Sequence, residues 1–520
     1  MKPMSTIFVL AASAILLASC AEPPPQVGIP AELREIMRAG QERAIPPPHP
    51  DLEAALQRYM TPNLSMETDA RVAEIVRQNP ADWNRLREIG SRAVLGTAHL
   101  YALLSHDELA DEIHFLFDLL RYGYGAYQYF GGDAVFLPLR DAMLERLARM
   151  SDPLRVSDYL RQILVPYLRT AIGDNHFQIH NVSLAARDYV AFMSEEFVLR
   201  RRGDYFVTEI DGSTHRVLET ALGCGTPVDG IMPTLTAEGE FAFAFGHLAA
   251  TNDRGAWAFD VVFESAATGE THSRAVNLAQ LGRYRPAGFQ RPSAREMDGV
   301  PVVTMRSFHL RDGADLGEMM RMSWAHRDSP VVVLDIRDIG GGDNSPGRAW
   351  LRGHLGGTQE PNRMVMFSSL RMVSATQAEL RSSWQFVSAS RVGQPPTWSV
   401  QGFTPPRNFI PNENLLIVLT DKGASSGGDI FVGYLRQLEN ALFVGTNTHG
   451  NYRSGGISRM VLPHSGLDII FSTYMNLRPD LSLFEGVGFL PDLWVPPVES
   501  LDRVLAFVER YGLNSVRDAN

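Results

Sequence analysis

The stretch VVVLDIRDIGGG at residues 331–342 decides the fold class, because it is an almost unbroken run of apolar residues that ends in three glycines. A run of this kind is typical of a parallel strand that is buried on both faces. Further apolar strands and helical patterns alternate around it, at residues 302–306, 315–326, 415–419, 430–438, 441–444 and 467–471. Strands that alternate with helices predict crossover connections, so we expect an α/β core over residues 295–500 and a C-terminal helix at 501–520.

The second buried run leads directly into the turn GASSGG at residues 423–428, and a helical pattern follows. A nucleophilic serine needs an exposed hydroxyl, a base within hydrogen-bond reach and N–H donors for the developing oxyanion. Ser426 satisfies the first and third needs, since the N–H groups at the start of a helix are free and electropositive. The alternative is a helix cap without chemistry, because serine and glycine are common in such turns.

Three segments with other sequence patterns precede the core. Residues 21–50 contain two proline clusters and predict an extended tether. Leucines and isoleucines at spacings of three and four predict an all-helical N-terminal domain over residues 51–190. Residues 195–290 carry short runs of strand-forming residues between Gly, Asp and Pro turns, which predicts a small β-rich domain.

The first twenty residues have the proportions of a signal peptide, with an apolar stretch at 7–17 that is too short to cross a bilayer. The sequence Leu-Ala-Ser-Cys that ends at Cys20 resembles the lipobox of bacterial lipoproteins. This resemblance implies a lipid anchor on Cys20, and Ala21 in place of aspartate favours the periplasmic face of the outer membrane. The alternative is an ordinary secretory signal in which Cys20 has no role.

Composition excludes several classes of protein. The 520-residue chain has 48 Lys and Arg against 59 Asp and Glu, and its net charge of −11 argues against general nucleic-acid binding. His-Glu-x-x-His, Walker-loop and Gly-x-Gly-x-x-Gly motifs are missing. His176 and His180 stand four residues apart but without a glutamate between them, and two cysteines form no metal-binding pair. We therefore predict no metal and no organic cofactor.

Four motifs, in this order, resemble the tail-specific (C-terminal processing) and tricorn-type serine peptidases: GDNHF at 173–177, DIRDIGGG at 335–342, SSGGD at 425–429 and EGVGFLPD at 485–492. The resemblance implies a crotonase-like α/β catalytic core with a helical N-terminal cap. In many relatives an insertion at the place of residues 195–290 is a PDZ domain, so a PDZ-like fold is one hypothesis for the β-rich domain.

The family uses either a lysine or a histidine as its base. Only Lys2 and Lys422 occur in the chain, and Asn451 stands where the processing branch has its lysine. An amide is no general base, and Lys422 lies off the family pattern. A Ser–Lys dyad is therefore not expected.

The tricorn-like branch uses a histidine as its base and a glutamate near the C-terminus. The resemblance to this branch implies that His176 is the base and that Glu485 orients it. Asn175 stands where that branch has a serine, and its amide could bridge His176 and Glu485. The resemblance further implies an oxyanion hole formed by the N–H groups of Gly427 and of either Gly340 or Gly341. His449 and His180 are alternative bases.

These residues predict an envelope-anchored serine endopeptidase that cleaves extracytoplasmic proteins or peptides, with a partner lipoprotein or a homo-oligomer left open. Two other classes remain as alternatives. Residues 423–427 also fit Gly-x-Ser-x-Gly, the nucleophile turn of α/β-hydrolase esterases, with Ser425 as nucleophile and His464 or His449 as base. A lipoprotein that binds peptides or apolar ligands without catalysis would use the same fold but would have no need of Ser426, His176 and Glu485 together.

Overall fold

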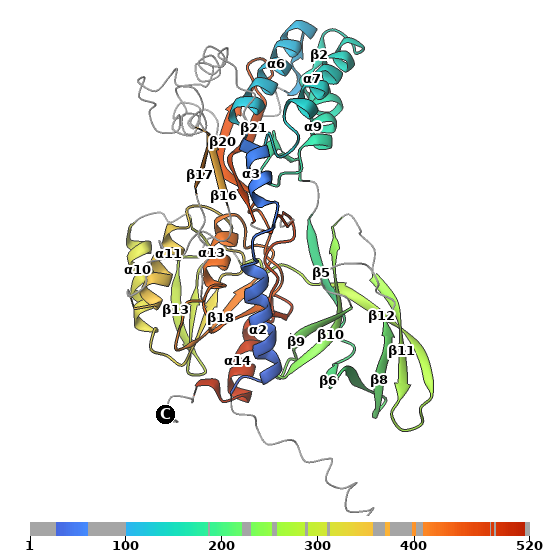
Figure 1. Cartoon of the computed structure of the whole chain (residues 1–520), viewed down its shortest axis with the longest axis vertical. Coiled ribbons are helices and arrows are strands. Elements are labelled where there is room, and N and C mark those ends of the chain that lie inside the picture. The colour runs from blue at the N-terminus through green and yellow to red at the C-terminus, as the bar shows by residue number, and fades with distance from the viewer. Residues whose placement is uncertain are drawn as a thin grey trace, which may run out of the picture.

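The structure is a computed structural model. It describes residues 28–60, 100–185, 188–220, 230–251, 257–286, 290–308, 313–356, 370–374, 398–401, 409–478, 480–482 and 485–514. These residues form three units: an α/β core, a helix-rich unit at one end of the molecule, and a strongly curved β-sheet beside the core (Figure 1). Cys20 lies outside the described residues.

The α/β core contains a six-stranded sheet in the order β13-β14-β15-β18-β19-β22. β13 pairs antiparallel with β14, and the other neighbours pair parallel. The strands are β13 (Ser293–Met297), β14 (Val300–Thr304), β15 (Val331–Asp335), β18 (Leu415–Thr420), β19 (Ala441–Gly445) and β22 (Leu493–Trp494). Every residue of β15, β18 and β19 is buried, as the apolar runs predict.

Helices cover both faces of this sheet, because successive side chains of a strand point to opposite faces. Leu334 and Val418 pack on the face covered by α10 (Gly313–Ala325), α11 (Ser345–His354) and α13 (Gly427–Leu435). Val333 and Ile417 pack on the other face, against α2 (Ala31–Ala44) and α14 (Ser500–Arg510). The mixed α/β fold class is confirmed.

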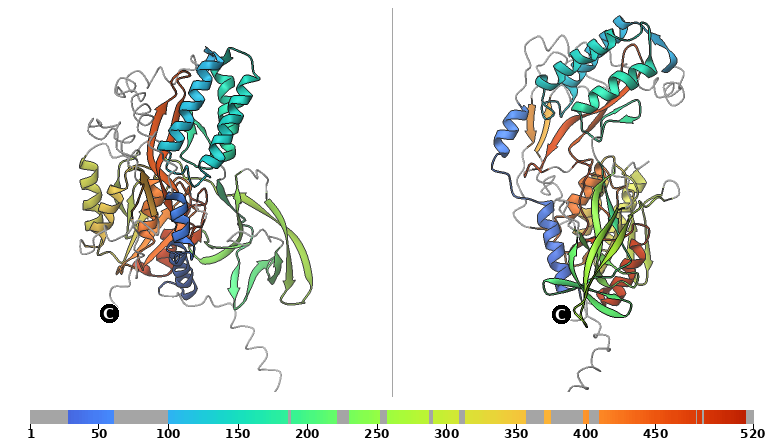
Figure 2. Two further views of the ribbon diagram at one scale, coloured as in Figure 1. Left: turned by 45° about the horizontal axis from the view of Figure 1, so that its top comes forward. Right: turned by 90° about the vertical axis from the view of Figure 1, so that its right-hand side faces the viewer.

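The extended tether predicted for residues 21–50 is wrong for residues 31–44, which form α2. Leu33 and Met37 of this helix are buried against the core sheet, and Figure 2 shows α2 lying along the core. Apolar residues recur every three or four positions in this segment, but the prolines on both sides obscured the pattern.

The helix-rich unit is not all-helical, which corrects the prediction for residues 51–190. Its helices are α3 (Leu52–Met60), α6 (His106–Gly123), α7 (Asp133–Ala148), α8 (Val156–Tyr159), the π-helical turn η2 (Leu160–Leu164) and α9 (Val165–Ala171). Two short pairs of strands accompany them: β1 (Leu103–Leu104) with β2 (Leu154–Arg155), and β3 (Gln178–Ile179) with β4 (Val182–Ser183). Two-residue strands are too short to show an alternating pattern in the sequence.

The core sends a long hairpin into this unit. Its strands are β20 (Ser454–Val461) and β21 (Asp468–Leu477), and β21 also pairs with β3 and β16 (Leu370–Ser374), which pairs with β17 (Trp398–Gln401). Leu467, Ile469 and Phe471 share one hydrophobic core with α6, α7 and α9. The hairpin therefore fixes the helix-rich unit to the part of the chain that follows β19.

The curved sheet has eight antiparallel strands in the order β6-β7-β8-β11-β12-β5-β10-β9. The strands are β5 (Tyr189–Met193), β6 (Arg200–Arg202), β7 (Tyr205–Ile210), β8 (Ser213–Thr220), β9 (Ile231–Leu235), β10 (Phe241–Ala250), β11 (Trp257–Ser265) and β12 (Thr271–Gln280). Leu199, next to β6, pairs with Phe243 in β10, so the sheet bends back on itself around Phe245 and Phe263. Its described residues form strands and turns, and the PDZ-like hypothesis gains no support from them.

Gly445 at the end of β19 offers a test of the core. Its φ is +131°, and a Cβ there would lie 2.0 Å from the carbonyl oxygen of Thr420 on β18. We expect Gly445→Ala to lower the free energy of unfolding by about 1–3 kcal/mol, because overpacking forces the paired strands apart. Thermal unfolding of Gly445→Ala beside Gly282→Ala, where a Cβ meets no atom within 4 Å, measures this. Equal midpoints for the two variants would contradict the close approach of β18 and β19.

Candidate active site

The predicted nucleophile turn lies between β18 and α13, at the carboxyl edge of the core sheet, where ligands bind in open α/β sheets. Ser426 precedes α13 and has a φ of +54° and a ψ of −109°, a conformation that non-glycine residues rarely adopt. Its N–H donates to Asp429 Oδ2 at 2.7 Å, which helps to hold this strained backbone. Backbone strain of this kind concentrates at functional sites.

The glycines at the end of the β15 segment lie directly against this turn. Gly340 pairs with Ala424 in a parallel bridge, and a Cβ on Gly341 would stand 3.0 Å from Ser426 Cβ and 3.4 Å from Ser426 Oγ. A Cβ on Gly427 would lie 2.5 Å from the Gly342 carbonyl oxygen. Only glycine leaves this space beside the Ser426 hydroxyl empty.

The two glycines predicted as alternatives for the oxyanion hole differ in the hydrogen bonds of their N–H groups. The N–H of Gly340 donates to the Gly423 carbonyl at 3.0 Å, so Gly340 is not available in this conformation. The N–H groups of Gly341 and Gly427 have no hydrogen-bond partner within the described part of the chain. These two N–H groups are therefore available to another acceptor beside Ser426.

Asp429 joins the nucleophile turn to the segment that follows β19. Besides the Ser426 N–H, this carboxylate accepts bonds from Thr448 Oγ1 and from the N–H groups of Gly450 and Asn451 at 3.0 Å each. The side chain is fully buried, and burial raises the pKa of Asp429 to about 6. Its acid character was visible in the sequence, but its contacts with residues 448–451 were not.

His176 follows α9 in the helix-rich unit and belongs to a short loop. Its N–H donates to Asp174 Oδ1 at 2.9 Å, and its ring Nδ1 lies 3.3 Å from Ser454 Oγ. The other ring nitrogen, Nε2, is buried and has no hydrogen-bond partner among the described residues. Burial lowers the pKa of His176, and the Asp174 charge partly opposes this, so the neutral ring is favoured at neutral pH.

The segment 448–454 connects the surroundings of Ser426 with those of His176. Asn451 contacts Asp429 beside the serine, and Ser454, three residues later, contacts the histidine. Within the described residues, no hydrogen bond joins Ser426 Oγ to His176.

Glu485 does not contact the imidazole as predicted. Its Oε1 accepts from the Asn175 N–H at 2.9 Å and its Oε2 from the Arg453 N–H at 3.1 Å. Burial and the nearby Asp174 charge raise the pKa of Glu485 to about 8. This carboxyl group therefore joins the histidine loop to the segment 448–454 through backbone contacts.

The predicted bridge through the Asn175 amide is also not formed. Both polar atoms of that side chain are buried without a hydrogen-bond partner among the described residues. Ser454 and Asp174 occupy the bridging place instead, since Ser454 Oγ donates to Asp174 Oδ1 at 2.7 Å. Asp174 stood in the quoted GDNHF motif, whereas Ser454 lies 278 residues from His176 and no sequence signal pointed to it.

Lys422, His180 and Ser425, three other residues that could carry chemistry, have polar partners of their own in the structure. Lys422 is buried, with Nζ 2.6 Å from Asp188 Oδ1 and donating to the carbonyls of Gly486 and His449. His180 Nδ1 lies 3.2 Å from Asp468 Oδ1. The second serine, Ser425, accepts a bond from Asn451 Nδ2 at 3.0 Å.

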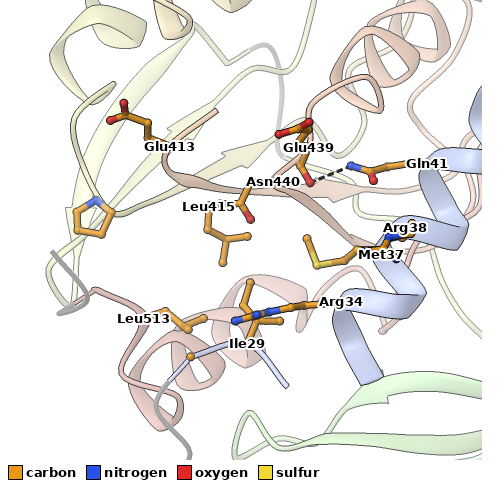
Figure 3. Close-up of a pocket in the computed structure, with 12 residues that line it drawn as sticks. Ile29, Arg34, Met37, Arg38, Gln41, Glu413, Leu415, Glu439, Asn440 and Leu513 are labelled. Atoms are coloured by element: carbon orange, nitrogen blue, oxygen red, sulfur yellow. Dashed lines mark hydrogen bonds between the residues drawn. The ribbon is translucent and has the colours of Figure 1, made fainter. Parts of the chain in front are cut away.

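A pocket of about 830 Å³ lies at the opposite, amino-terminal edge of the core sheet (Figure 3). Its lining includes Arg34 and Arg38 from α2, Leu415 at the start of β18, and Glu413 and Glu439. Pro330, which also lines the pocket, and Glu413 precede β15 and β18, and the carboxyl ends of these two strands lead to Gly341 and Ser426. The pocket is therefore separate from the candidate active site. The part of the chain that is described contains no cluster of three or more metal-ligating side chains and no helix long and apolar enough to cross a bilayer.

Comparison with known proteins relates part of the chain to a known family. Residues 299–495, which include the Gly341 loop, Ser426 and Glu485, match the model of peptidase family S41. These residues form an S41 peptidase domain. The chain is thus a serine-type peptidase that acts on proteins or peptides, and the resemblance to tail-specific and tricorn-type peptidases is confirmed.

Solved structures similar to this chain include mature CPAF, with 14% identity over 78% of this chain and 96% of that one and a TM-score of 0.38. The photosystem II D1 C-terminal processing protease has 13% identity over 78% and 98% of the two chains, with a TM-score of 0.35. The tricorn protease has 12% identity over 78% of this chain and 37% of that one, with a TM-score of 0.32. No curated protein sequence matches the chain.

The space beside Ser426 in the S41 domain can be tested by filling it. We expect Gly341→Ala to slow the reaction of the serine with a fluorophosphonate by about a hundredfold, because a displacement near 1 Å has that effect on reacting groups. Gly317→Ala, where a Cβ meets no atom within 4 Å, should react at the wild-type rate. Both variants should unfold near the wild-type temperature, and an unchanged rate for Gly341→Ala would separate Gly341 from the site.

Proposed function

We propose that this chain is an envelope-anchored serine endopeptidase in which Ser426 is the nucleophile and His176 the general base. The observation that carries the proposal is the strained Ser426 at the start of α13, packed against Gly341 and beside the unpartnered N–H groups of Gly341 and Gly427. That arrangement provides a nucleophile and two oxyanion donors in one place. The segment 448–454 supplies the connection to His176.

In this mechanism Ser426 Oγ attacks the scissile carbonyl carbon while its proton passes to His176 Nε2. The carbonyl oxygen becomes an oxyanion, which accepts bonds from the Gly341 and Gly427 N–H groups. His176 then returns the proton to the leaving amine, and the peptide bond breaks to give an acyl-serine. Water, deprotonated by the same nitrogen, releases the acid and regenerates Ser426.

The proposed location rests on the sequence alone. Cys20 and the apolar stretch before it predict a lipid anchor on the bacterial envelope, with the outer membrane favoured by Ala21. The substrates would then be extracytoplasmic proteins or peptides. A partner lipoprotein or a homo-oligomer stays a prediction.

Labelling with a fluorophosphonate, which reacts with activated serines, tests the chemistry. We expect the full chain in detergent to be labelled, and Ser426→Ala and His176→Ala to lose labelling by at least about a hundredfold. The labelling rate should rise with pH through a midpoint below the ordinary histidine value of about 6.5, because burial lowers the pKa of His176 and its neutral form is the base.

Ser425→Ala is the matched control, since its hydroxyl lies one residue away and contacts Asn451. It should keep labelling. Loss with Ser425→Ala alone would instead support the esterase alternative, and an unlabelled wild-type chain would support a binding protein.

The anchor has its own test in the two cysteines of the chain. In a bacterial host, wild type and Cys224→Ala should incorporate radioactive palmitate and sediment with membranes. Cys20→Ala should do neither, because the acceptor thiol is gone. Palmitate incorporation by Cys20→Ala would contradict the proposed anchor.

A further inference from the structure

Three hydrogen-bonding groups lie in line behind His176, on the side of the ring away from Nε2. His176 Nδ1 lies 3.3 Å from Ser454 Oγ, Ser454 Oγ lies 2.7 Å from Asp174 Oδ1, and Asp174 Oδ2 lies 2.8 Å from Tyr124 Oη. Ser454, Asp174 and Tyr124 are each less than 4% exposed, so water does not compete for these contacts.

Counting the protons shows which group donates and which accepts in each of these hydrogen bonds. A serine hydroxyl has one proton, and Ser454 donates it to the Asp174 carboxylate, which can only accept. Toward His176 the same oxygen can therefore only accept, so Nδ1 must carry the ring proton. The tautomer with a proton on Nδ1 leaves the Nε2 lone pair free, and Nε2 is the nitrogen without a partner.

Three donors hold Asp174 in place. Its carboxylate accepts from Tyr124 Oη, Ser454 Oγ and the His176 N–H. Its ring-side neighbour Ser454 begins strand β20, whose hairpin is fixed in the core of the helix-rich unit. The hydrogen-bonded relay from His176 through Ser454 to Asp174 therefore comes from two segments, the loop of Asp174 and the start of β20. Each of these segments is held in place by its own contacts.

The other charged groups near His176 do not replace Asp174. Arg453 precedes Ser454, and its side chain lies over the ring of Tyr129. Both oxygens of Glu485 are used by backbone N–H groups of Asn175 and Arg453. Burial raises the pKa of Glu485 to about 8, which favours the uncharged carboxyl at neutral pH.

We propose that Ser454 and Asp174 are the positioning residues of this peptidase, in the place that Glu485 was expected to fill. Ser454 sets the tautomer and orientation of His176, and Asp174 stabilises the imidazolium that forms when Nε2 takes the Ser426 proton. The inference rests on the proposed function of Ser426 and His176. Tyr124 donates a hydrogen bond to Asp174 and so affects His176 only through Asp174.

The first experiment measures the fluorophosphonate reaction rate against pH for the full chain and its variants. Ser454→Ala should lower the plateau rate about tenfold or more, and Ser454→Thr should restore it because threonine keeps the hydroxyl. Asp174→Asn should lower the plateau and also move the midpoint to lower pH by roughly one unit. Removing a negative charge lowers the pKa of a nearby histidine, and the rate rises as that histidine loses its proton.

Ser472→Ala is the matched control for Ser454→Ala. It removes a buried hydroxyl on the paired strand β21, and that hydroxyl has no partner among the described residues. This variant should react like wild type. The relay is overturned if Ser454→Ala and Asp174→Asn keep the wild-type rate and midpoint while Glu485→Gln loses them.

The second experiment does not depend on activity. In the full chain with ¹⁵N-labelled histidine, the His176 signals, assigned by their loss in His176→Gln, should show the proton on Nδ1 at neutral pH. Ser454→Ala should move the tautomer population toward Nε2, and Asp174→Asn should lower the titration midpoint. A wild-type ring protonated on Nε2 would overturn the relay. A chain that fails to react with the fluorophosphonate but shows the Nδ1 tautomer would overturn the proposed function alone.

Discussion

The buried Asp429 carboxylate is the contact on which the arrangement of the site depends. It fixes the strained backbone of Ser426 on one side and the N–H groups of Gly450 and Asn451 on the other. Three residues after Asn451 the chain reaches Ser454, which contacts His176. A single carboxylate thus sets where the nucleophile turn lies relative to the strand that carries the histidine's partner. Because its acceptors face four donors, replacing it leaves buried N–H groups unpaired, and each such group costs about 1–3 kcal/mol.

The histidine and the serine belong to different structural units, and the hairpin of β20 and β21 joins those units. The hairpin leaves the α/β core after β19 and adds Leu467, Ile469 and Phe471 to the hydrophobic core of the helix-rich unit. Glu485 reinforces the junction, because its carboxyl group accepts from the backbone N–H groups of Asn175 in the helix-rich unit and of Arg453 next to β20. The precision of the site therefore comes from packing within one unit and from hydrogen bonds between the two.

The sequence was sufficient for the features that leave a local pattern. Buried parallel strands appear as apolar runs, and the serine turn and the GDNHF motif are contiguous, so the α/β core and the candidate residues Ser426 and His176 could be named. Contacts between distant segments leave no such pattern. Ser454 could not be linked to His176, nor Gly340 N–H to Gly423, before the chain was folded. The tether prediction failed over α2 because prolines at both ends outweighed an amphipathic pattern of fourteen residues between them.

The place where the chain joins the core also limits where an anchored enzyme could work. The Gly28 N–H donates to the carbonyl of Tyr511, so the chain is attached to the core at that residue. Between Cys20 and Gly28 a fully extended chain spans at most about 30 Å. With a lipid on Cys20, the catalytic domain would be confined to a thin layer next to the bilayer, and only polypeptides that enter this layer would meet Ser426. Distance from the membrane would then select substrates before any contact in the active site does.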